Sequence, residues 1–216
     1  MYIAIDSAEN MTYTGVISGN VSDIYNVYSG FITTFKKRGV NPPFHWRKIS
    51  RDVKYSYSCM KEVAQAINDS KLLINILRHK RAPEMERKIV FYELLPQYIS
   101  LKISPWVKEL EGKMVIDVDD DYRLGEHNNT SKFLISLIES LCYDLTGIQI
   151  YSRKVYDTIR ATIKQKKGIL EFYGNVVDSN SSNGVQIIDM ILGYVIQGDC
   201  KDFDRRKLHR WDIFRK

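Results

Sequence analysis

Near its C-terminus the chain reads Val185-Gln186-Ile187-Ile188-Asp189-Met190-Ile191-Leu192-Gly193-Tyr194-Val195-Ile196-Gln197. At about 100° per residue, apolar side chains would cover most of the circumference of a helix with this sequence. The exceptions fall on one narrow stripe: Gln186, Asp189, Gly193 and Gln197. A helix that is apolar nearly all round is buried, and a buried carboxylate is costly unless it is paired or bound to a metal ion. We therefore predict a buried helix from which Asp189 faces a specific partner, such as other carboxylates that share a cation.

The chain before this helix alternates between strand and helix patterns. Two strand-like runs, at 2–6 and 11–18, predict an antiparallel hairpin, and residues 21–38 fit either a strand or a short helix. Further extended segments are expected at 44–48, 71–77, 114–119, 148–153 and 169–177. Helices are expected at 52–68, 84–101 (kinked or broken at Pro96), 130–143 and, with a basic character, 155–166.

An initial hairpin followed by alternating strands and helices indicates an α/β protein with a mixed sheet. The sequence contains no repeat and no linker, so we predict a single domain over 1–216, with an insertion or a long crossover around 78–111. With 44% hydrophobic residues the chain can bury a core.

Composition narrows the class of protein. The cysteines, Cys59, Cys142 and Cys200, are far apart and form no CxxC pair, which argues against both a disulfide framework and a zinc site. No apolar run approaches the ~18 residues of a membrane span, and the N-terminus reads as a strand and not as a signal peptide. We expect a soluble, cytoplasmic protein without a membrane partner. The formal net charge of +6 is compatible with a polyanionic partner.

Acidic residues follow several of the predicted strands. Asp6 closes the first strand and Asp178 closes the strand at 169–177, while Asp117 and Asp119 share one face at the end of the strand at 114–119. Acids at strand ends of an open α/β sheet are well placed to converge. Carboxylates without a His or Cys pattern suit Mg²⁺ or Mn²⁺. Two such ions ~4 Å apart can activate a water and stabilise the leaving oxygen of a phosphodiester.

Each of these acids also has a structural interpretation. An aspartate at the end of a strand is commonly a turn former or a helix cap. Asp189 could be a buried acid that is hydrogen-bonded to backbone, and Asp120 and Asp121 fit solvated loop acids. The joint pattern is more specific than any one of its members.

The pattern resembles a known superfamily at three places: Ile3-Ala4-Ile5-Asp6-Ser7, Val177-Asp178-Ser179 and Val185 to Gly193. These segments are similar to the ribonuclease H-like superfamily, and within it to the domain-of-unknown-function 3800 family. The segment Phe44-His45-Trp46 also resembles the short third strand of that family. The resemblance implies a ribonuclease H-like mixed sheet, with Asp6, Asp117 and Asp189 as catalytic, metal-binding acids and Asp178 close by. Asp119 is the alternative to Asp117. The family often has Glu-Ser-Gly after its first aspartate, whereas this chain has Ser7-Ala8-Glu9. Ribonuclease H-like enzymes often carry an acid on the first helix, and Glu62 is the candidate for it here. The alternative interpretation of Glu62 is a solvated helix residue.

Basic residues gather in two stretches. Asp157 alone opposes six cations in the first: Arg153, Lys154, Arg160, Lys164, Lys166 and Lys167. The second, 205–211, mixes cations with Trp211. Lysine and arginine neutralise phosphates and Trp211 could stack on a base, although such runs are commonly solvated faces and Trp211 could instead anchor the tail.

Three functional hypotheses follow. The leading one is a nuclease, dependent on Mg²⁺ or Mn²⁺, that acts on DNA or RNA. The alternative is a catalytically degenerate module of the same fold that binds nucleic acid or a protein. An actin-like ATPase is disfavoured because no glycine-rich phosphate loop follows Asp6.

Overall fold

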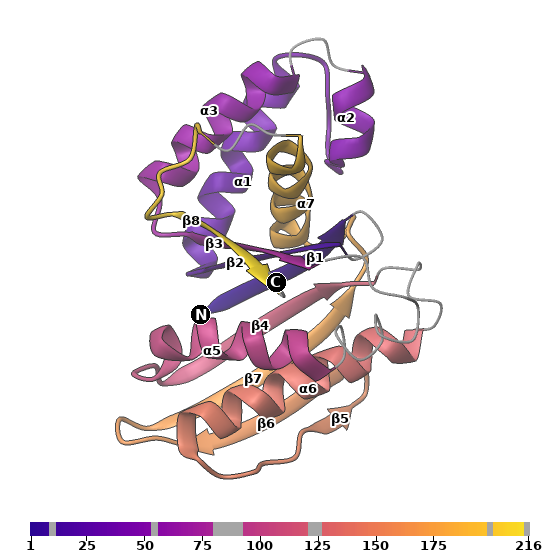
Figure 1. The fold of residues 1–216 in the computed structure, drawn as a ribbon. Helices are drawn as coiled ribbons and strands as arrows, with labels where there is room; N and C mark the ends of the chain where they lie inside the picture. Colours follow the sequence, from indigo (N-terminus) through magenta and orange to yellow (C-terminus); the bar gives the residue numbers. More distant parts are fainter. Residues whose placement is uncertain (9–11, 53–55, 80–92, 121–126, 198–200, 214–216) are drawn as a thin grey trace. The chain divides into compact units, whose positions relative to one another are not determined.

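The computed structural model describes residues 1–8, 12–52, 56–79, 93–120, 127–197 and 201–213. The chain divides into two compact units, and each is an α/β structure with a mixed sheet (Figure 1). Unit 1 comprises Met1 and Arg81–Val177, and unit 2 comprises Tyr2–Lys80 and Asp178–Lys216. The single domain over 1–216 and the ribonuclease H-like identity of the fold stay predictions.

Among its described residues, unit 2 has four strands in the order β1-β2-β3-β8. β1 (Tyr2–Ala8), β2 (Tyr13–Gly19) and β3 (Leu73–His79) are antiparallel neighbours, and β8 (Leu208–Ile213) runs parallel to β3. Its described helices are α1 (Val21–Lys36), α2 (Trp46–Asp52), α3 (Ser56–Asp69) and α7 (Asn183–Ile196). α7 lies across β1 and β2 (Figure 1).

Two glycines bring α7 close to the sheet. A Cβ added to Gly15 of β2 would lie 2.6 Å from Ile188 Cγ1, and one added to Gly184 of α7 would lie 2.8 Å from the Cβ of Ala4. Any side chain at either position would push helix and sheet apart. α7 therefore follows β1 from Ala4 towards the strand's far end, with Ile188 above Gly15.

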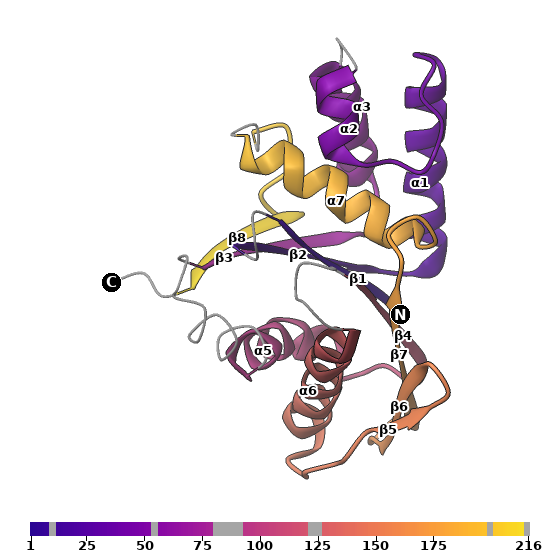
Figure 2. The same ribbon diagram turned by 90° about the vertical axis from the view of Figure 1, so that its right-hand side faces the viewer.

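The described part of unit 1 contains four strands in the order β5-β6-β7-β4. β4 (Gly112–Asp119) runs parallel to β7 (Ile169–Val177), β6 (Thr158–Lys164) is antiparallel to β7, and β5 (Arg153–Val155) is antiparallel to β6. Two helices, α5 (Leu95–Val107) and α6 (His127–Thr146), lie on the same side of this sheet (Figure 2). A Cβ on Gly174 of β7 would lie 2.8 Å from both Leu134 Cγ and Ile138 Cδ1 of α6, so this side chain position faces the helix. Within the described part of unit 1, no helix covers the opposite face of the sheet.

Most of the predicted elements are confirmed. The structure has the N-terminal hairpin, strands at β3, β4 and β7, and helices at α3, α6 and α7, and the ambiguous segment 21–38 is the helix α1. Pro96 lies in the first turn of α5, where its missing N–H costs nothing, so it is not a kink within the helix. Part of the expected helix at 84–101, and part of the expected insertion at 78–111, lie outside the described residues.

Three predicted elements are wrong. The expected basic helix at 155–166 is a turn followed by β6, in which buried Ile159, Ala161 and Ile163 alternate with exposed residues. Of the expected strand at 148–153, only Arg153 belongs to β5. The expected extended segment at 44–48 becomes helical at Trp46, where α2 begins. The basic stretch at 205–211 contributes to a strand, β8, that the sequence pattern did not predict.

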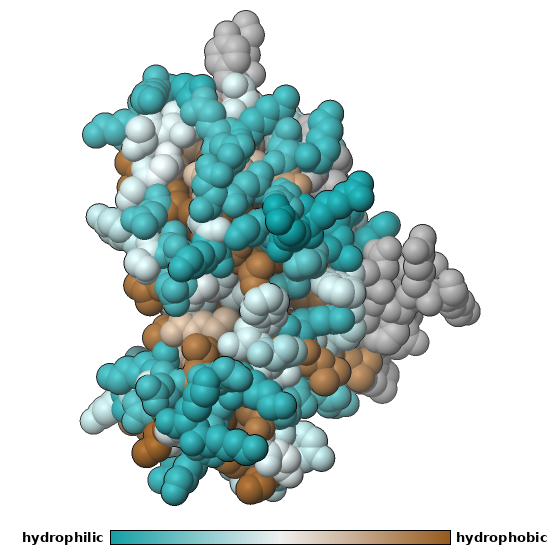
Figure 3. Space-filling model, turned by 90° about the vertical axis from the view of Figure 1, so that its left-hand side faces the viewer, coloured by the Kyte–Doolittle hydropathy of each residue, from teal (hydrophilic) through white to brown (hydrophobic). Residues whose placement is uncertain are grey.

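The surface carries mostly hydrophilic side chains on the side drawn in Figure 3. Hydrophobic side chains form small separate groups on this side. Among the described residues, no helix is both long enough and apolar enough to cross a membrane.

Candidate functional site

The polar stripe of α7, formed by Gln186, Asp189, Gly193 and Gln197, receives the segment 44–57. Gln186 is 2% exposed, and its Oε1 accepts hydrogen bonds from the Tyr28 hydroxyl (2.7 Å) and from the Phe44 backbone N–H (2.8 Å). Its Nε2 donates to the carbonyl of Asn180 at 3.1 Å. The buried amide therefore has partners on both its donor and acceptor sides, as a buried polar group requires.

Asp189 occupies the next position of the stripe and is partly exposed, because 28% of its side chain is accessible. Its Oδ2 accepts a hydrogen bond from the backbone N–H of Trp46 at 3.1 Å, and this N–H is one of the unpaired donors at the start of α2. The same oxygen lies 3.4 Å from Nδ1 of His45, whose Nε2 is 3.1 Å from Oδ1 of Asn180. Asp189 thus has specific partners, as predicted, but the partners described in unit 2 are a helix start and a histidine.

Gly193 provides the space for this docking. A Cβ added there would lie 1.8 Å from Cδ1 of Trp46, whose ring also packs edge-on against Tyr57 and Tyr194 at centroid distances of 5.8 and 6.0 Å. Gln197, at the end of the stripe, accepts a hydrogen bond from the Tyr57 hydroxyl. Each member of the polar stripe therefore contacts the segment 44–57.

Asp6 lies on the face of β1 that is covered by α7. It is the register partner of Gly15, and directly paired residues of antiparallel strands project to the same face. Since Gly15 faces Ile188, Asp6 lies at the same level of α7 as Ile188, the residue before Asp189. Asp6 is 6% exposed, and its Oδ1 accepts a hydrogen bond from the backbone N–H of Ser7 at 2.7 Å. The packing of β1, β2 and α7 thus brings Asp6 and Asp189 to one level of the helix.

Two other predicted acids of unit 2 have structural hydrogen bonds. The exposed Asp178 accepts bonds from both the backbone N–H and the Nδ2 of Asn180, each at 2.7 Å, which fixes the turn before α7. Glu62 lies 2.9 Å from the guanidinium of Arg38 on the surface, and this hydrogen bond lowers the pKa of Glu62. Glu62 is therefore placed in a surface ion pair.

In unit 1, Asp117 belongs to a short ladder of polar side chains. Asn175 donates from Nδ2 to Asp117 Oδ1 at 2.9 Å, and Thr158 donates from its hydroxyl to Asn175 Oδ1 at 3.2 Å. These three residues are register partners across β4, β7 and β6. Asp119 follows two residues later on the same face of β4, as the alternation of the strand predicts.

The five predicted ligands divide between the two units: Asp117 and Asp119 belong to unit 1, and Asp6, Asp178 and Asp189 belong to unit 2. Within the described part of either unit, no group of three or more His, Cys, Asp or Glu side chains is placed to hold a metal ion. The sequence pattern did not assign roles to His45 and Asn180, which contact each other next to Asp189 and Asp178. The sequence feature that could have indicated a role for His45 is the histidine itself, which lies between Phe44 and Trp46 in a segment that resembles the family's third strand.

Comparison with known proteins adds no further constraint on this site. No protein family model, no curated protein and no solved structure matches the chain.

Proposed function

We propose that the protein is a divalent-metal-dependent nuclease that hydrolyses phosphodiester bonds. Asp6 and Asp189 are the ligands in unit 2, where Asp178 supports them, and Asp117 and Asp119 of unit 1 stay candidate ligands on the ground of the sequence alone. The observation that carries this proposal is the packing of β1, β2 and α7, which brings Asp6 and Asp189 to the same level of α7. Carboxylate oxygens are the donors that Mg²⁺ and Mn²⁺ prefer.

The surroundings of the two carboxylates in unit 2 suit a cation. Backbone N–H groups orient both of them: Ser7 for Asp6 and Trp46 for Asp189. A backbone donor positions a carboxylate without bringing a full positive charge of its own. A bound divalent ion would supply an activated water and stabilise the leaving oxygen. His45 lies beside Asp189, with its Nδ1 3.4 Å from Asp189 Oδ2.

A nuclease assay tests the proposal. Single- and double-stranded DNA, RNA and hybrid substrates are incubated with Mg²⁺ or Mn²⁺ and with wild type, Asp6→Asn or Asp189→Asn protein. Each variant should lose at least about 100-fold in rate, the order of magnitude seen when one charge-stabilising group leaves a catalytic site. Asp69→Asn, which changes an exposed carboxylate of α3 that is bonded to Gln65, is the matched control and should retain full activity.

Folding must be separated from catalysis in this experiment. Asparagine keeps an oxygen that can accept the Trp46 N–H, so Asp189→Asn should melt within a few degrees of wild type. Equal rates for wild type and Asp189→Asn on every substrate would overturn the catalytic assignment.

A second candidate function, a binding module without catalysis, is favoured by the structural bonds of the same acids. Asp189 accepts a hydrogen bond at the start of α2, and Asp117 accepts one from Asn175. Salt-sensitive binding of nucleic acid without cleavage under any metal condition would select this alternative.

A further inference from the structure

The sheet of unit 1 has one face that its described helices leave uncovered, which we call the open face. Gly174 points towards α6, and its register partners are Ile159 on β6 and Ile116 on β4. Because side chains alternate along a strand, Tyr173 and its partner Arg160 point to the opposite side. The open face is thus the side of β5, β6, β7 and β4 that carries Tyr173 and Arg160.

Two arginines oppose each other on this face. Arg153 of β5 and Arg160 of β6 are register partners, and both are exposed. Like charges directly opposite each other on neighbouring strands destabilise a sheet. Neither guanidinium forms an ion pair with a carboxylate among the described residues. An anion that binds between them would relieve this repulsion.

The ring of Tyr173 on β7 contacts a cation from each of the two neighbouring strands. The guanidinium of Arg160 lies 5.1 Å from its ring centroid, and the ammonium of Lys113 on β4 lies 5.6 Å from the same centroid. The Tyr173 hydroxyl donates to Glu171 at 2.8 Å, which fixes the ring. Arg153, Arg160 and Lys113 therefore form a row of cations that reaches from β5 to β4, held in part by cation–π contacts.

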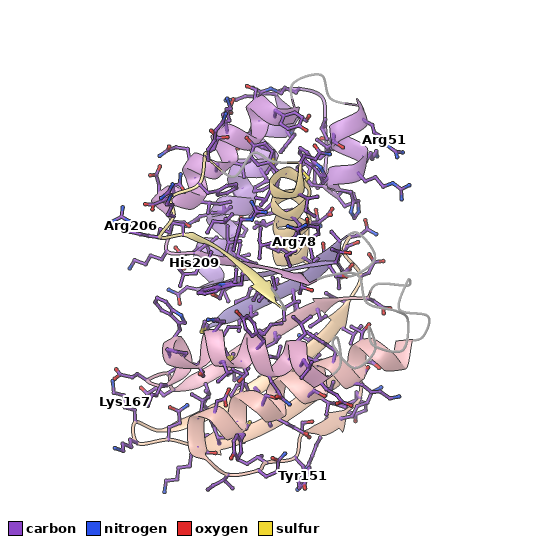
Figure 4. All side chains as sticks on the ribbon, in the orientation of Figure 1. Arg51, Arg78, Tyr151, Lys167, Arg206 and His209 are labelled. Carbon is purple, nitrogen blue, oxygen red and sulfur yellow. The ribbon has the colours of Figure 1, made fainter. Side chains whose placement is uncertain are left out.

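Exposed aromatic rings lie beside this row in the chain. Tyr151 precedes β5 and is 77% exposed, and Tyr156, in the turn between β5 and β6, is 91% exposed. Tyr151 projects outward from the edge of unit 1 (Figure 4). Tyr156 has a φ of +54°, a conformation that a bulky side chain rarely adopts. Cations interleaved with exposed aromatic rings are typical of surfaces that bind single-stranded nucleic acid, where phosphates meet the cations and unpaired bases stack on the rings.

Two acidic residues on the open face accept hydrogen bonds from neighbouring polar side chains. Glu171 accepts the bond from Tyr173, and Asp117 accepts the bond from Asn175. Neither lies in the register pair of Arg153 and Arg160, so the cationic end of the face remains suited to an anion.

We propose that the open face binds a single-stranded nucleic acid, with Arg153, Arg160 and Lys113 on its phosphates and Tyr151 and Tyr156 on its bases. The proposal rests on the proposed function only for the class of polymer, because a nuclease must bind nucleic acid. It assigns a binding surface on residues that take no part in metal binding.

Binding is measured by fluorescence anisotropy with labelled single-stranded and duplex oligonucleotides, in EDTA so that no metal-dependent cleavage occurs. The test variant is Arg153→Ala/Arg160→Ala in the full chain. The control removes the same charge from the side of unit 1 away from the open face: Lys154→Ala, whose register partner is the buried Ile159, with Lys132→Ala on α6. Arg153→Lys/Arg160→Lys preserves the charge.

The arginine-to-alanine variant should bind single strands at least about 10-fold more weakly at low salt. The slope of log K against log[salt] should decrease in magnitude by about 1.4, because each removed arginine leaves one phosphate of the single strand without its counter-charge. The control should change affinity less than about 2-fold, and the lysine variant should keep the wild-type slope. The lysine variant also decides the question if the alanine variant fails to fold, because a reduced salt slope in the lysine variant would contradict binding of phosphates by these two positions.

Other outcomes overturn the proposal. Equal or tighter binding of duplex would exclude a single-strand surface, and competition by poly-glutamate as effective as by an unlabelled oligonucleotide would indicate an acidic protein as the partner. Absence of oligonucleotide binding, or an equal loss in the control, would also contradict it. Arginine-dependent binding without any cleavage would leave this inference standing while the proposed nuclease activity fails, and cleavage insensitive to both arginines would do the reverse.

Discussion

The polar stripe of α7 and the open face of unit 1 each contain a side-chain amide in a hydrogen-bonded network. Water reaches the amide of Asn175 on the open face but not the amide of Gln186 in the stripe. Gln186 is 2% exposed, and its partners are a hydroxyl, a backbone N–H and a carbonyl. Asn175 is half-buried on an uncovered sheet face, between Thr158 and Asp117. A buried group whose partner is removed cannot turn to water, whereas a group on an open face can. Gln186 therefore serves folding first, whereas the polar residues around Asn175 can serve a ligand.

The largest effect on stability is expected for Gln186→Ala. It would leave the Tyr28 hydroxyl and the Phe44 N–H without their acceptor, and burial raises the pKa of Tyr28, so this hydroxyl remains a donor at neutral pH. Two orphaned buried donors should lower the free energy of unfolding by about 3 kcal/mol, measured by urea denaturation. Gln197→Ala at the C-cap of the same helix, where Gln197 is exposed, is the control and should cost less than about 1 kcal/mol. Equal losses of unfolding free energy in Gln186→Ala and Gln197→Ala would mean that burial of the amide does not determine the size of the destabilisation.

Gly193→Ala should have the next largest effect. The new methyl group would lie 1.8 Å from Trp46, so the ring or α2 must move, and overpacking of this kind costs about 1–3 kcal/mol even though alanine favours a helix. Gly30→Ala in α1 is the matched control, because its Cβ would meet nothing within 4 Å, and it should stabilise the protein by up to about 1 kcal/mol. Thermal unfolding in both backgrounds, wild type and Trp46→Ala, separates the clash with the indole from other causes. A full penalty that persists without the indole would rule out Trp46 as its source.

The sequence predicted the structure correctly where the polar and apolar residues of one helix or strand fall on separate faces. The stripe on α7 correctly indicated that Asp189 has a specific partner and that Gly193 leaves room for a close approach, although the approaching group is Trp46. The hairpin pattern was enough to place Asp6 on β1, although the strand does not end at Asp6 and continues to Ala8. Its level on α7, however, follows from the register with Gly15, which a sequence alone does not show.

The errors arose where distant residues decide the structure. The segment 158–164 contains Arg, Ala and Lys, which favour a helix, and it forms a strand because it pairs with β7 and turns Ile159 and Ile163 inward. The aromatic residues at 44–46 suggested a strand, but α2 begins at Trp46, whose N–H is accepted by Asp189, 143 residues away. The same long-range contact explains why His45 was not assigned to the site, since nothing near it in the chain indicates its neighbour.

Asn175→Ala tests the amide of the open face and should have the smallest effect on the free energy of unfolding. Its loss would remove the bonds to Asp117 and Thr158, but water can reach both residues on the open face and replace the amide. We expect the free energy of unfolding to fall by less than about 1 kcal/mol under the conditions used for Gln186→Ala. Asp117→Asn, measured alone and combined with Asn175→Ala, gives the coupling between the two, which should not exceed about 0.5 kcal/mol on an exposed face. A loss as large as that of Gln186→Ala would show that the ladder is sealed from water, and the open face would then not be accessible to a nucleic acid strand.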